Sequence, residues 1–298
     1  MMDYIAYDAA AHRVWVPAGN TGSVDAIDVR TGAVARVEGF KTKEVERNGK
    51  KRTVGPSSVT VGKGVIYAGN RADQSVCAAD EATLTLGACV SLDSSPDGIA
   101  YVDLTSEVWV TTPRDKSLRV LDAKTLAQKA KITLPGEPEG YAVDNARGVF
   151  YTNLEDKDRT LVINLKSHAV TATWLPACGE DGPKGLSLDR AKNVLLVACS
   201  DHVISLDAGH DGKKLGSVPV GEGVDNIDYV EPRHELFAAA GRAAKLVVAK
   251  LGDDGQLTAV ATTATTSGAR NAVATEDGDA YLIDPPEGAI YVVPATAR

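Results

Sequence analysis

Short runs of alternating apolar and polar residues follow one another along the whole chain, and turn residues separate them. One run recurs with a turn behind it: SVDAIDVRTG at 23–32, SVCAADEATL at 75–84, SLRVLDAKTL at 117–126, TLVINLKSHA at 160–169 and HVISLDAGHD at 202–211. A second, more apolar run precedes each copy, and a third precedes that one. The runs are rich in Val, Ile, Tyr and Leu, as a half-buried β-sheet requires. The pattern predicts β-strands throughout and no helix of useful length.

The strands group into repeats of about 40 to 45 residues, each with three or four strands. Four antiparallel strands per repeat, arranged around an axis, make a β-propeller. We therefore predict an all-β fold: one seven-bladed β-propeller domain over residues 1–298, with four-stranded antiparallel blades. The last blade has three strands, or its fourth strand was lost together with a leader. The blades are expected to begin near residues 3, 57, 97, 139, 184, 225 and 270.

In four of the recurring runs, the strand ends in an aspartate before the turn begins. These residues are Asp28, Asp80, Asp122 and Asp207. A carboxylate at the end of a strand can accept hydrogen bonds from backbone N–H groups in the next turn. We expect these aspartates to stabilise turns.

Two of the motifs carry a resemblance to a known family. RGVFYTN and SVDAIDVRTG resemble the repeats of the YVTN-repeat family, the YncE-like seven-bladed propellers, and the resemblance covers nearly the whole chain. It implies the architecture but not the chemistry, because one fold hosts many functions. Relatives in this family include bacterial periplasmic or surface proteins. Similar propellers occur as subunits of quinoprotein dehydrogenases and nitrite reductases.

Composition narrows the choice of partners. The net charge is −8, and an acidic surface repels phosphate backbones, so nucleic acid is an unlikely partner. The same negative charge also disfavours docking on anionic lipid. No apolar run approaches the roughly 20 residues that a membrane span needs. The chain opens MMDYIAYD and enters a predicted strand at once, which is typical of a protein whose leader has been removed, although a cytoplasmic N-terminus would look the same.

The stretches SSPDGIAYVD and GEPEGYAVDN raise the question of a binding site, because a turn needs their Pro and Gly but not their acids. Aligning the seven blade entries places a polar residue at the same position each time: Asp3, Ser57, Asp97, Glu139, Lys184, Asp225 and Arg270. Asn226 and Asn271 follow one step later. We expect these side chains to gather at one mouth of the central channel and, apart from Asp3, to form the candidate ligand-binding set.

Three interpretations of this ring stay open. The acids and bases can neutralise one another in a network of salt bridges and water. Alternatively, Asp97, Glu139 and Asp225, with Asn226, can bind a divalent cation such as Ca²⁺, which prefers carboxylate and carbonyl oxygens. Such a site resembles that of the metal-dependent, gluconolactonase-like propellers. In the third interpretation a small polar molecule binds, with Lys184 and Arg270 holding its anionic group.

The loops between second and third strands should open on the same face. They carry Asn20, Asn70, Arg71, Arg114, Asn153, Asp201, Arg242 and Asp284. Asn is common in turns because it tolerates a left-handed backbone, so we interpret these Asn residues as turn formers. Arg71 and Arg114 are expected to be exposed to solvent.

Residues 39–55 form the one large insertion. Asn48 and Gly49, flanked by VER and KKR, predict a hairpin with a type I′ turn. The insertion holds six bases and two acids and joins blade one to blade two, so it should rise over the channel mouth. It is either a solvent-exposed hairpin or a flap that contacts a ligand or a protein partner.

Cysteine positions favour two disulfides, Cys77–Cys89 and Cys178–Cys199, and an oxidising compartment, periplasmic or extracellular. The signatures G-x-S-x-G, P-loop and H-E-x-x-H do not occur, and the five His residues do not cluster. The sequence therefore favours a non-catalytic binding or scaffold protein that holds a small polar molecule or a protein partner at the channel mouth. The alternatives are a metal-dependent hydrolase of lactonase type and a subunit of a redox complex.

Overall fold

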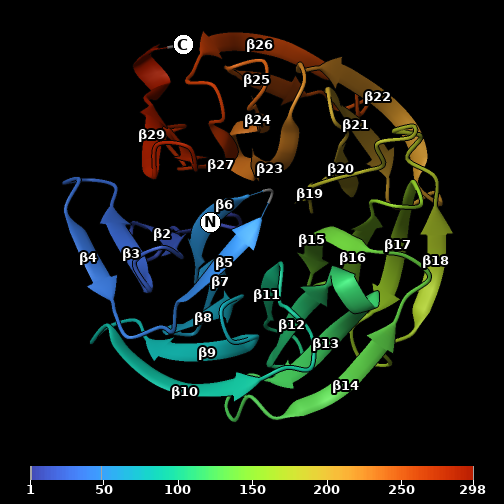
Figure 1. Cartoon of the computed structure of the whole chain (residues 1–298). Coiled ribbons are helices and arrows are strands. Elements are labelled where there is room, and N and C mark those ends of the chain that lie inside the picture. Colours follow the sequence, from blue (N-terminus) through green and yellow to red (C-terminus); the bar gives the residue numbers. More distant parts are fainter. Residues whose placement is uncertain (1, 48, 298) are drawn as a thin grey trace. The chain divides into compact units, whose positions relative to one another are not determined.

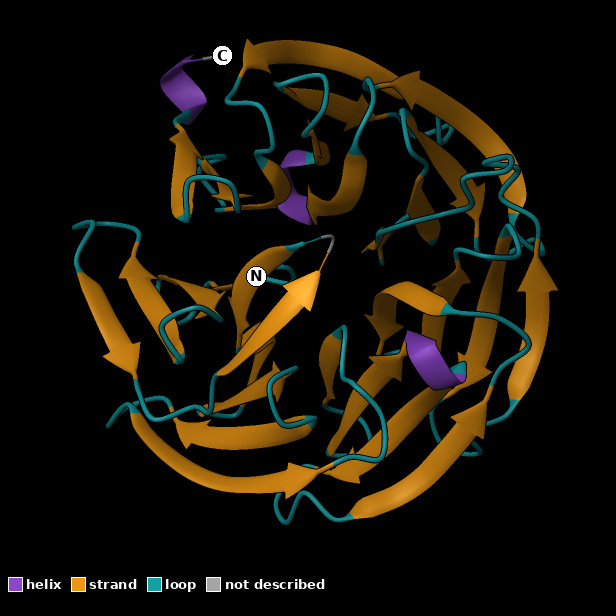
Figure 2. Ribbon diagram, in the orientation of Figure 1, coloured by secondary structure: helices purple, strands orange, loops and turns teal. Residues whose placement is uncertain are grey.

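The computed structural model describes residues 2–47 and 49–297. The chain forms two compact units, one ending at Pro138 and one beginning at Glu139. Strands dominate both units, as Figure 2 shows, and the described helical segments are three short 3-10 turns at Pro113–Asp115, Glu231–Arg233 and Ala295–Ala297. No helix in the described ranges is long and apolar enough to cross a membrane.

The first unit holds three four-stranded antiparallel sheets and a separate hairpin, and Figure 1 labels their strands from β2 to β14. The first sheet contains β1 (Ala6–Asp8), β2 (Arg13–Ala18), β3 (Ser23–Asp28) and β4 (Val34–Val37). The hairpin consists of β5 (Lys43–Arg47) and β6 (Lys50–Val54). The second sheet contains β7 (Pro56–Gly62), β8 (Val65–Asn70), β9 (Ser75–Asp80) and β10 (Thr85–Ser91). The third contains β11 (Ile99–Val102), β12 (Glu107–Thr112), β13 (Ser117–Asp122) and β14 (Gln128–Thr133).

The second unit holds three four-stranded sheets and one three-stranded sheet. Its first two sheets contain β15 (Pro138–Asp144), β16 (Val149–Leu154), β17 (Arg159–Asn164) and β18 (Val170–Trp174), then β19 (Leu186–Asp189), β20 (Val194–Ala198), β21 (His202–Asp207) and β22 (Lys213–Pro219). The third contains β23 (Val224–Val230), β24 (Glu235–Ala240), β25 (Lys245–Leu251) and β26 (Leu257–Ala264). The last contains β27 (Arg270–Ala274), β28 (Ala280–Asp284) and β29 (Ala289–Val293).

This arrangement confirms the predicted fold class, an all-β seven-bladed propeller whose last described blade has three strands. The burial pattern explains the hydrophobic pattern of the repeat. A second strand such as β12 is buried along its whole length, whereas the outer strand β10 is mostly exposed. A strand covered on both faces needs a nearly continuous apolar run, and a strand with one face in water alternates. Neighbouring blades pack these apolar faces together, as Trp15, Val59 and Ile66 do in the first unit.

The aspartates at strand ends stabilise turns as predicted. In the first blade, Oδ1 of Asp28 accepts hydrogen bonds from the backbone N–H groups of Arg30 (2.9 Å) and Thr31 (3.0 Å). The Arg30 side chain and these N–H groups lower the pKa of Asp28 to about 2. Asp80, Asp122 and Asp207 accept equivalent bonds in their own blades. The same hydrogen bonds from backbone N–H groups to an aspartate therefore stabilise the corresponding turn in these four blades.

Both predicted disulfides are present, Cys77–Cys89 and Cys178–Cys199. Cys77 and Cys89 lie directly opposite each other on β9 and β10. Cys178 lies in the loop that leads to β19, and the disulfide joins this loop to the residue after β20. The second disulfide therefore restrains the loop that carries Lys184.

Candidate functional site

The first unit places three predicted polar residues where inner strands begin. Asp3 precedes β1, Ser57 is the second residue of β7, and Asp97 precedes β11. The backbone N–H of Asp3 donates to the carbonyl of Ser57 (3.1 Å), and that of Asp97 donates to the carbonyl of Thr111 (2.9 Å). Backbone hydrogen bonds therefore fix the segments leading into inner strands, which we call entry loops.

Arg71 joins two of these entry loops. It follows β8, and its Nη2 lies 2.9 Å from Oδ2 of Asp3 and also contacts Oδ1 of Asp97. The Nε of Arg71 donates to the carbonyl of Pro96 (3.4 Å). The expectation that Arg71 is exposed to solvent is wrong, because only 24% of its side chain is accessible.

The Arg71 cluster, made of Arg71, Asp3 and Asp97, combines one positive charge with two carboxylates. Burial alone would lower the pKa of Arg71, but Asp97 and Asp3 outweigh it and raise that pKa above its ordinary value. The guanidinium is therefore always charged and serves both acids at once. This cation, which the sequence interpretation did not assign to the site, neutralises much of the charge of Asp97.

In the second unit the predicted bases are also paired. Lys184 Nζ lies 2.8 Å from Oε2 of Glu155, and Arg270 Nε lies 3.2 Å from Oδ2 of Asp225. Glu139 is the second residue of β15 and is partly buried. The pairing of Asp225 with Arg270 agrees with the interpretation in which acids and bases neutralise one another. Lys184 instead contacts Glu155, an acid that the sequence alignment did not place at the site.

The two predicted asparagines connect neighbouring entry loops. The backbone N–H of Asn226 donates to Oδ1 of Asn271 (2.9 Å), and Asn271 has a left-handed backbone with φ of 53°. Gly185 lies against Asn226 so closely that an added Cβ would sit 2.6 Å from its Cα. The side-chain Nδ2 of Asn226 is buried and has no hydrogen-bond partner among the described residues. An amide donor is thus held in place without an acceptor.

Entry residues of three blades lie in β-bulges. The strand pairing shifts between Pro56 and Ser58, between Val224 and Ile227, and between Arg270 and Val273. These shifts contain the candidate residues Ser57, Asp225, Asn226 and Asn271. A bulge bends its strand and redirects a side chain, and bulges are frequent next to binding sites. The sequence analysis did not find them, because they lie in the first residues of short strands, where too few alternating positions precede the shift to reveal it.

The candidate metal ligands Asp97, Glu139 and Asp225 are divided between the two units, so the proposal that they meet stays a prediction. Within the described ranges, no group of three or more His, Cys, Asp or Glu side chains is arranged to hold a metal ion. Asp97 and Asp225 each face an arginine instead.

Asp228, farther along β23, is a polar residue that the sequence interpretation missed. Its two carboxylate oxygens accept hydrogen bonds from the backbone N–H groups of Tyr229 and Ala274, both at 2.8 Å. Burial raises the pKa of Asp228, and these two hydrogen bonds only partly offset the rise. A carboxyl group with a raised pKa near a polar cluster is a candidate for a functional role.

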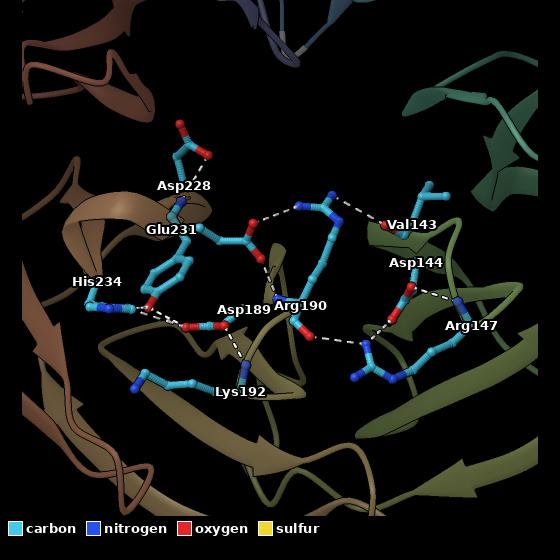
Figure 3. A network of polar contacts seen from close by, with 10 residues as sticks. Val143, Asp144, Arg147, Asp189, Arg190, Lys192, Asp228, Glu231 and His234 are labelled. Carbon is cyan, nitrogen blue, oxygen red and sulfur yellow. Dashed lines mark hydrogen bonds and ion pairs between the residues drawn. The ribbon is translucent and has the colours of Figure 1, made fainter.

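A second polar network lies at the other end of the inner strands, in the turns that lead to second strands (Figure 3). The buried carboxylate of Asp189 accepts from the Tyr229 hydroxyl (2.6 Å) and from the backbone N–H of Lys192 (2.7 Å). Burial, followed by contact with Asp189, raises the pKa of Tyr229. Arg190 contacts Glu231 and donates to the carbonyl of Val143 (3.3 Å), which links three consecutive blades.

Comparisons with known proteins show the fold alone. No family model and no curated protein sequence matches the chain. Among solved structures, it is similar to a chain of the mitotic checkpoint complex, with 12% identity, a TM-score of 0.79 and coverage of 98% of this chain and 86% of that one. It is also similar to a chain of hydrazine synthase from Kuenenia stuttgartiensis, with 13% identity, a TM-score of 0.80 and coverage of 99% and 96%. A third similar structure is U3-55K, with 9% identity, a TM-score of 0.74 and coverage of 94% and 87%. The chain therefore has the propeller fold that these proteins share.

Proposed function

We propose that this protein is a non-catalytic binding protein whose entry loops hold a small polar molecule. The loops of the second unit, around Asp225, Asn226, Arg270 and Asn271, are the best candidate for the contact surface. The propeller fold is compatible with a binding or scaffold role, although a fold by itself does not choose among functions.

The observation that carries the proposal is the side-chain amide of Asn226. Its Nδ2 is buried without a partner in the described part of the chain, next to an asparagine in a left-handed conformation. Leaving a buried donor unpaired costs about 1–3 kcal/mol, so such a group calls for a specific explanation. Because this nitrogen is buried, a ligand oxygen reaches it only when the entry loops around Asn226 move apart, and the oxygen then supplies the missing hydrogen bond.

The charges nearby favour a ligand that is neutral or zwitterionic rather than a simple anion. Lys184 and Arg270 already pair with Glu155 and Asp225. An incoming anion would have to displace these carboxylates. Hydroxyl and carbonyl oxygens, such as those of sugars and amino acids, can accept from Asn226 without displacing either ion pair.

Saturation-transfer NMR with mixtures of monosaccharides, polyols and amino acids tests the proposal. We expect at least one class of probe to receive signal from the full chain. Asn226→Ala should abolish that transfer while the circular dichroism spectrum stays unchanged. Asn20→Ala removes an exposed turn asparagine in the first unit and is the matched control, with transfer expected to stay at the level of the unmodified chain.

Two results would contradict the proposal. In one, none of the three probe classes receives signal. In the other, Asn226→Ala and the unmodified chain give the same transfer. Turnover of a lactone that depends on added Ca²⁺ would instead support the alternative of a metal-dependent hydrolase using Asp97, Glu139 and Asp225.

We further propose that the protein belongs among the YVTN-repeat propellers and functions in the periplasm or outside the cell. The family proposal is supported by the repeated strand motifs, such as RGVFYTN. The proposed location is supported by the two disulfides, since disulfides persist mainly in oxidising compartments.

A further inference from the structure

The hairpin of β5 and β6 has the opposite charge to the rest of the protein. Residues 39–55 contain six Lys or Arg and two Glu, a net charge of +4, in a chain whose net charge is −8. The remaining residues therefore carry −12. The predicted turn residue Asn48 lies outside the described residues, whereas both strands are described.

Strand pairing sorts these charges between the two faces of the hairpin. Lys43 pairs with Val54 and Val45 pairs with Arg52, while Glu44 pairs with Thr53 and Glu46 with Lys51. Side chains alternate between faces along a strand. One face, which we call the basic face, therefore carries Lys43, Val45, Lys50, Arg52 and Val54. Both glutamates lie on the other face.

The basic face is accessible and its charges are not neutralised locally. Lys43, Lys50 and Arg52 are exposed, and Val45 and Val54 are partly exposed between them. None of these three bases forms an ion pair with another described residue. On the opposite face Lys51 pairs with Glu44 at 2.9 Å.

Both ends of the hairpin are anchored to the same turn of the first unit. The side-chain Nδ2 of Asn70 donates to the carbonyl of Lys41 (3.0 Å), and the backbone N–H of Arg71 donates to the carbonyl of Gly55 (3.0 Å). A Cβ on Gly55 would lie 2.3 Å from the carbonyl oxygen of Gly19, so this base is tightly packed. Figure 1 shows β5 and β6 as a ribbon separate from the outer strands β4 and β10. The hairpin is therefore anchored at its base and extends away from the outer strands.

We propose that the basic face docks an extended acidic peptide segment of a partner protein, in which acidic and apolar residues alternate. Three bases separated by two valines are complementary in charge and in spacing to such a segment. A long nucleic acid or an anionic bilayer would extend beyond the hairpin and meet the acidic remainder of the chain, which repels it. A short peptide contacts the hairpin alone. This inference does not depend on the proposed small-molecule site.

Fluorescence anisotropy with a labelled peptide of alternating Glu and Val measures the proposed contact. The full chain should bind this peptide more tightly than the same peptide with Gln in place of Glu. The triple variant Lys43→Ser, Lys50→Ser, Arg52→Ser should raise the Kd about tenfold, since exposed ion pairs contribute modestly and three are lost. Added salt should weaken the binding of the unmodified chain.

The control variant carries Lys166→Ser, Lys213→Ser and Lys214→Ser, three exposed bases of the second unit, and changes the net charge equally. Its Kd should stay within about twofold of the unmodified chain, less than the loss of one good pair. The proposal is overturned if both triple variants weaken binding equally or if the Glu and Gln peptides bind alike. Tighter binding of single-stranded DNA or of anionic vesicles would overturn it too. So would self-association that the basic-face variant abolishes, because a second copy would then be the occupant.

Discussion

Replacing Arg71 with Met should destabilise the first unit more than any change to either of its acidic partners. Met keeps much of the length of the side chain but removes the guanidinium that contacts Asp3 and Asp97. Only 12% and 11% of these two carboxylate side chains are accessible, so water can solvate them poorly. The variant would therefore leave two poorly solvated negative charges close together.

The size of the effect follows from burial and distance. Opposite charges about 4 Å apart attract by about 4 kcal/mol at an effective dielectric constant of about 20, and desolvation offsets part of this attraction. Removing one partner of a buried ion pair typically costs about 3–5 kcal/mol. We expect the lower end, about 3 kcal/mol, because the cluster keeps some solvent contact. Asp97→Asn should cost less than about 1 kcal/mol, since Asp3 still neutralises Arg71.

Urea denaturation followed by circular dichroism gives the free energy of unfolding for each variant. A loss of about 3 kcal/mol corresponds to a melting temperature lower by about 5 °C when the whole chain unfolds together. The double variant Arg71→Met, Asp97→Asn should recover part of the loss, because one of the two neighbouring negative charges is gone. Arg30→Met is the matched control, since 62% of the Arg30 side chain is accessible and its loss should cost less than about 0.5 kcal/mol.

The reasoning would be refuted if Arg71→Met cost no more than Arg30→Met. It would also fail if Asp97→Asn were as destabilising as Arg71→Met. The stability of the cluster would then come from the contact between Arg71 and Asp97 itself and not from the balance of charges. A double variant less stable than Arg71→Met alone would point to packing as the main role of Asp97.

Two further predictions concern the second unit. Cys178→Ala with Cys199→Ala should lower the free energy of unfolding by about 3 kcal/mol, the size expected for a disulfide between residues 21 apart in sequence. Urea denaturation measures this loss, and a value under about 1 kcal/mol would contradict the prediction. Burial, followed by the charge of Asp144, raises the pKa of Tyr151 to about 12, above the value of about 10 expected when the chain is unfolded. The free energy of unfolding that comes from keeping Tyr151 protonated should be complete below pH of about 10 and decline as the pH rises toward 12. Tyr151→Phe should reduce this alkaline loss of stability, which denaturation at a series of pH values measures. An unchanged pH profile in the variant would contradict the prediction.

The repeat made the fold predictable, because each blade has the same order of strands and turn residues. A strand such as SLRVLD ends in an aspartate whose carboxylate closes the next turn, and the structure contains that turn in blade after blade. Both disulfides were predictable for a related reason. Cys77 and Cys89 lie on consecutive strands, so the register of one hairpin sets them opposite each other.

The sequence predicts which polar residues stand at the blade entries but not how they pair. The alignment of blade entries identified Asp97 and Asp225, but Arg71 reaches Asp97 from a turn of the preceding blade, 26 residues away. The sequence places Arg71 on the same face, in a turn between second and third strands, but composition alone does not show that its guanidinium turns toward the acids instead of toward solvent. The bulges at Ser57 and Asn226 lie in the first residues of their strands, where too few alternating positions precede them to show a shift.

Both ends of the inner strands in the second unit contain an asparagine whose side chain is not fully satisfied. In the turn network of Figure 3, Asp189 accepts two hydrogen bonds, and Arg190 contacts the blades on either side of its own. Asn193, in the turn after β19, has a left-handed backbone and a buried Oδ1 without a described partner. At the entry end, Nδ2 of Asn226 is likewise buried without a described partner, and Asn271 has a left-handed backbone. The entry end differs in its β-bulges, which contain Asn226 and Asn271, and bulges are frequent next to binding sites. The bulges are therefore the reason to expect recognition at the entry end of the second unit.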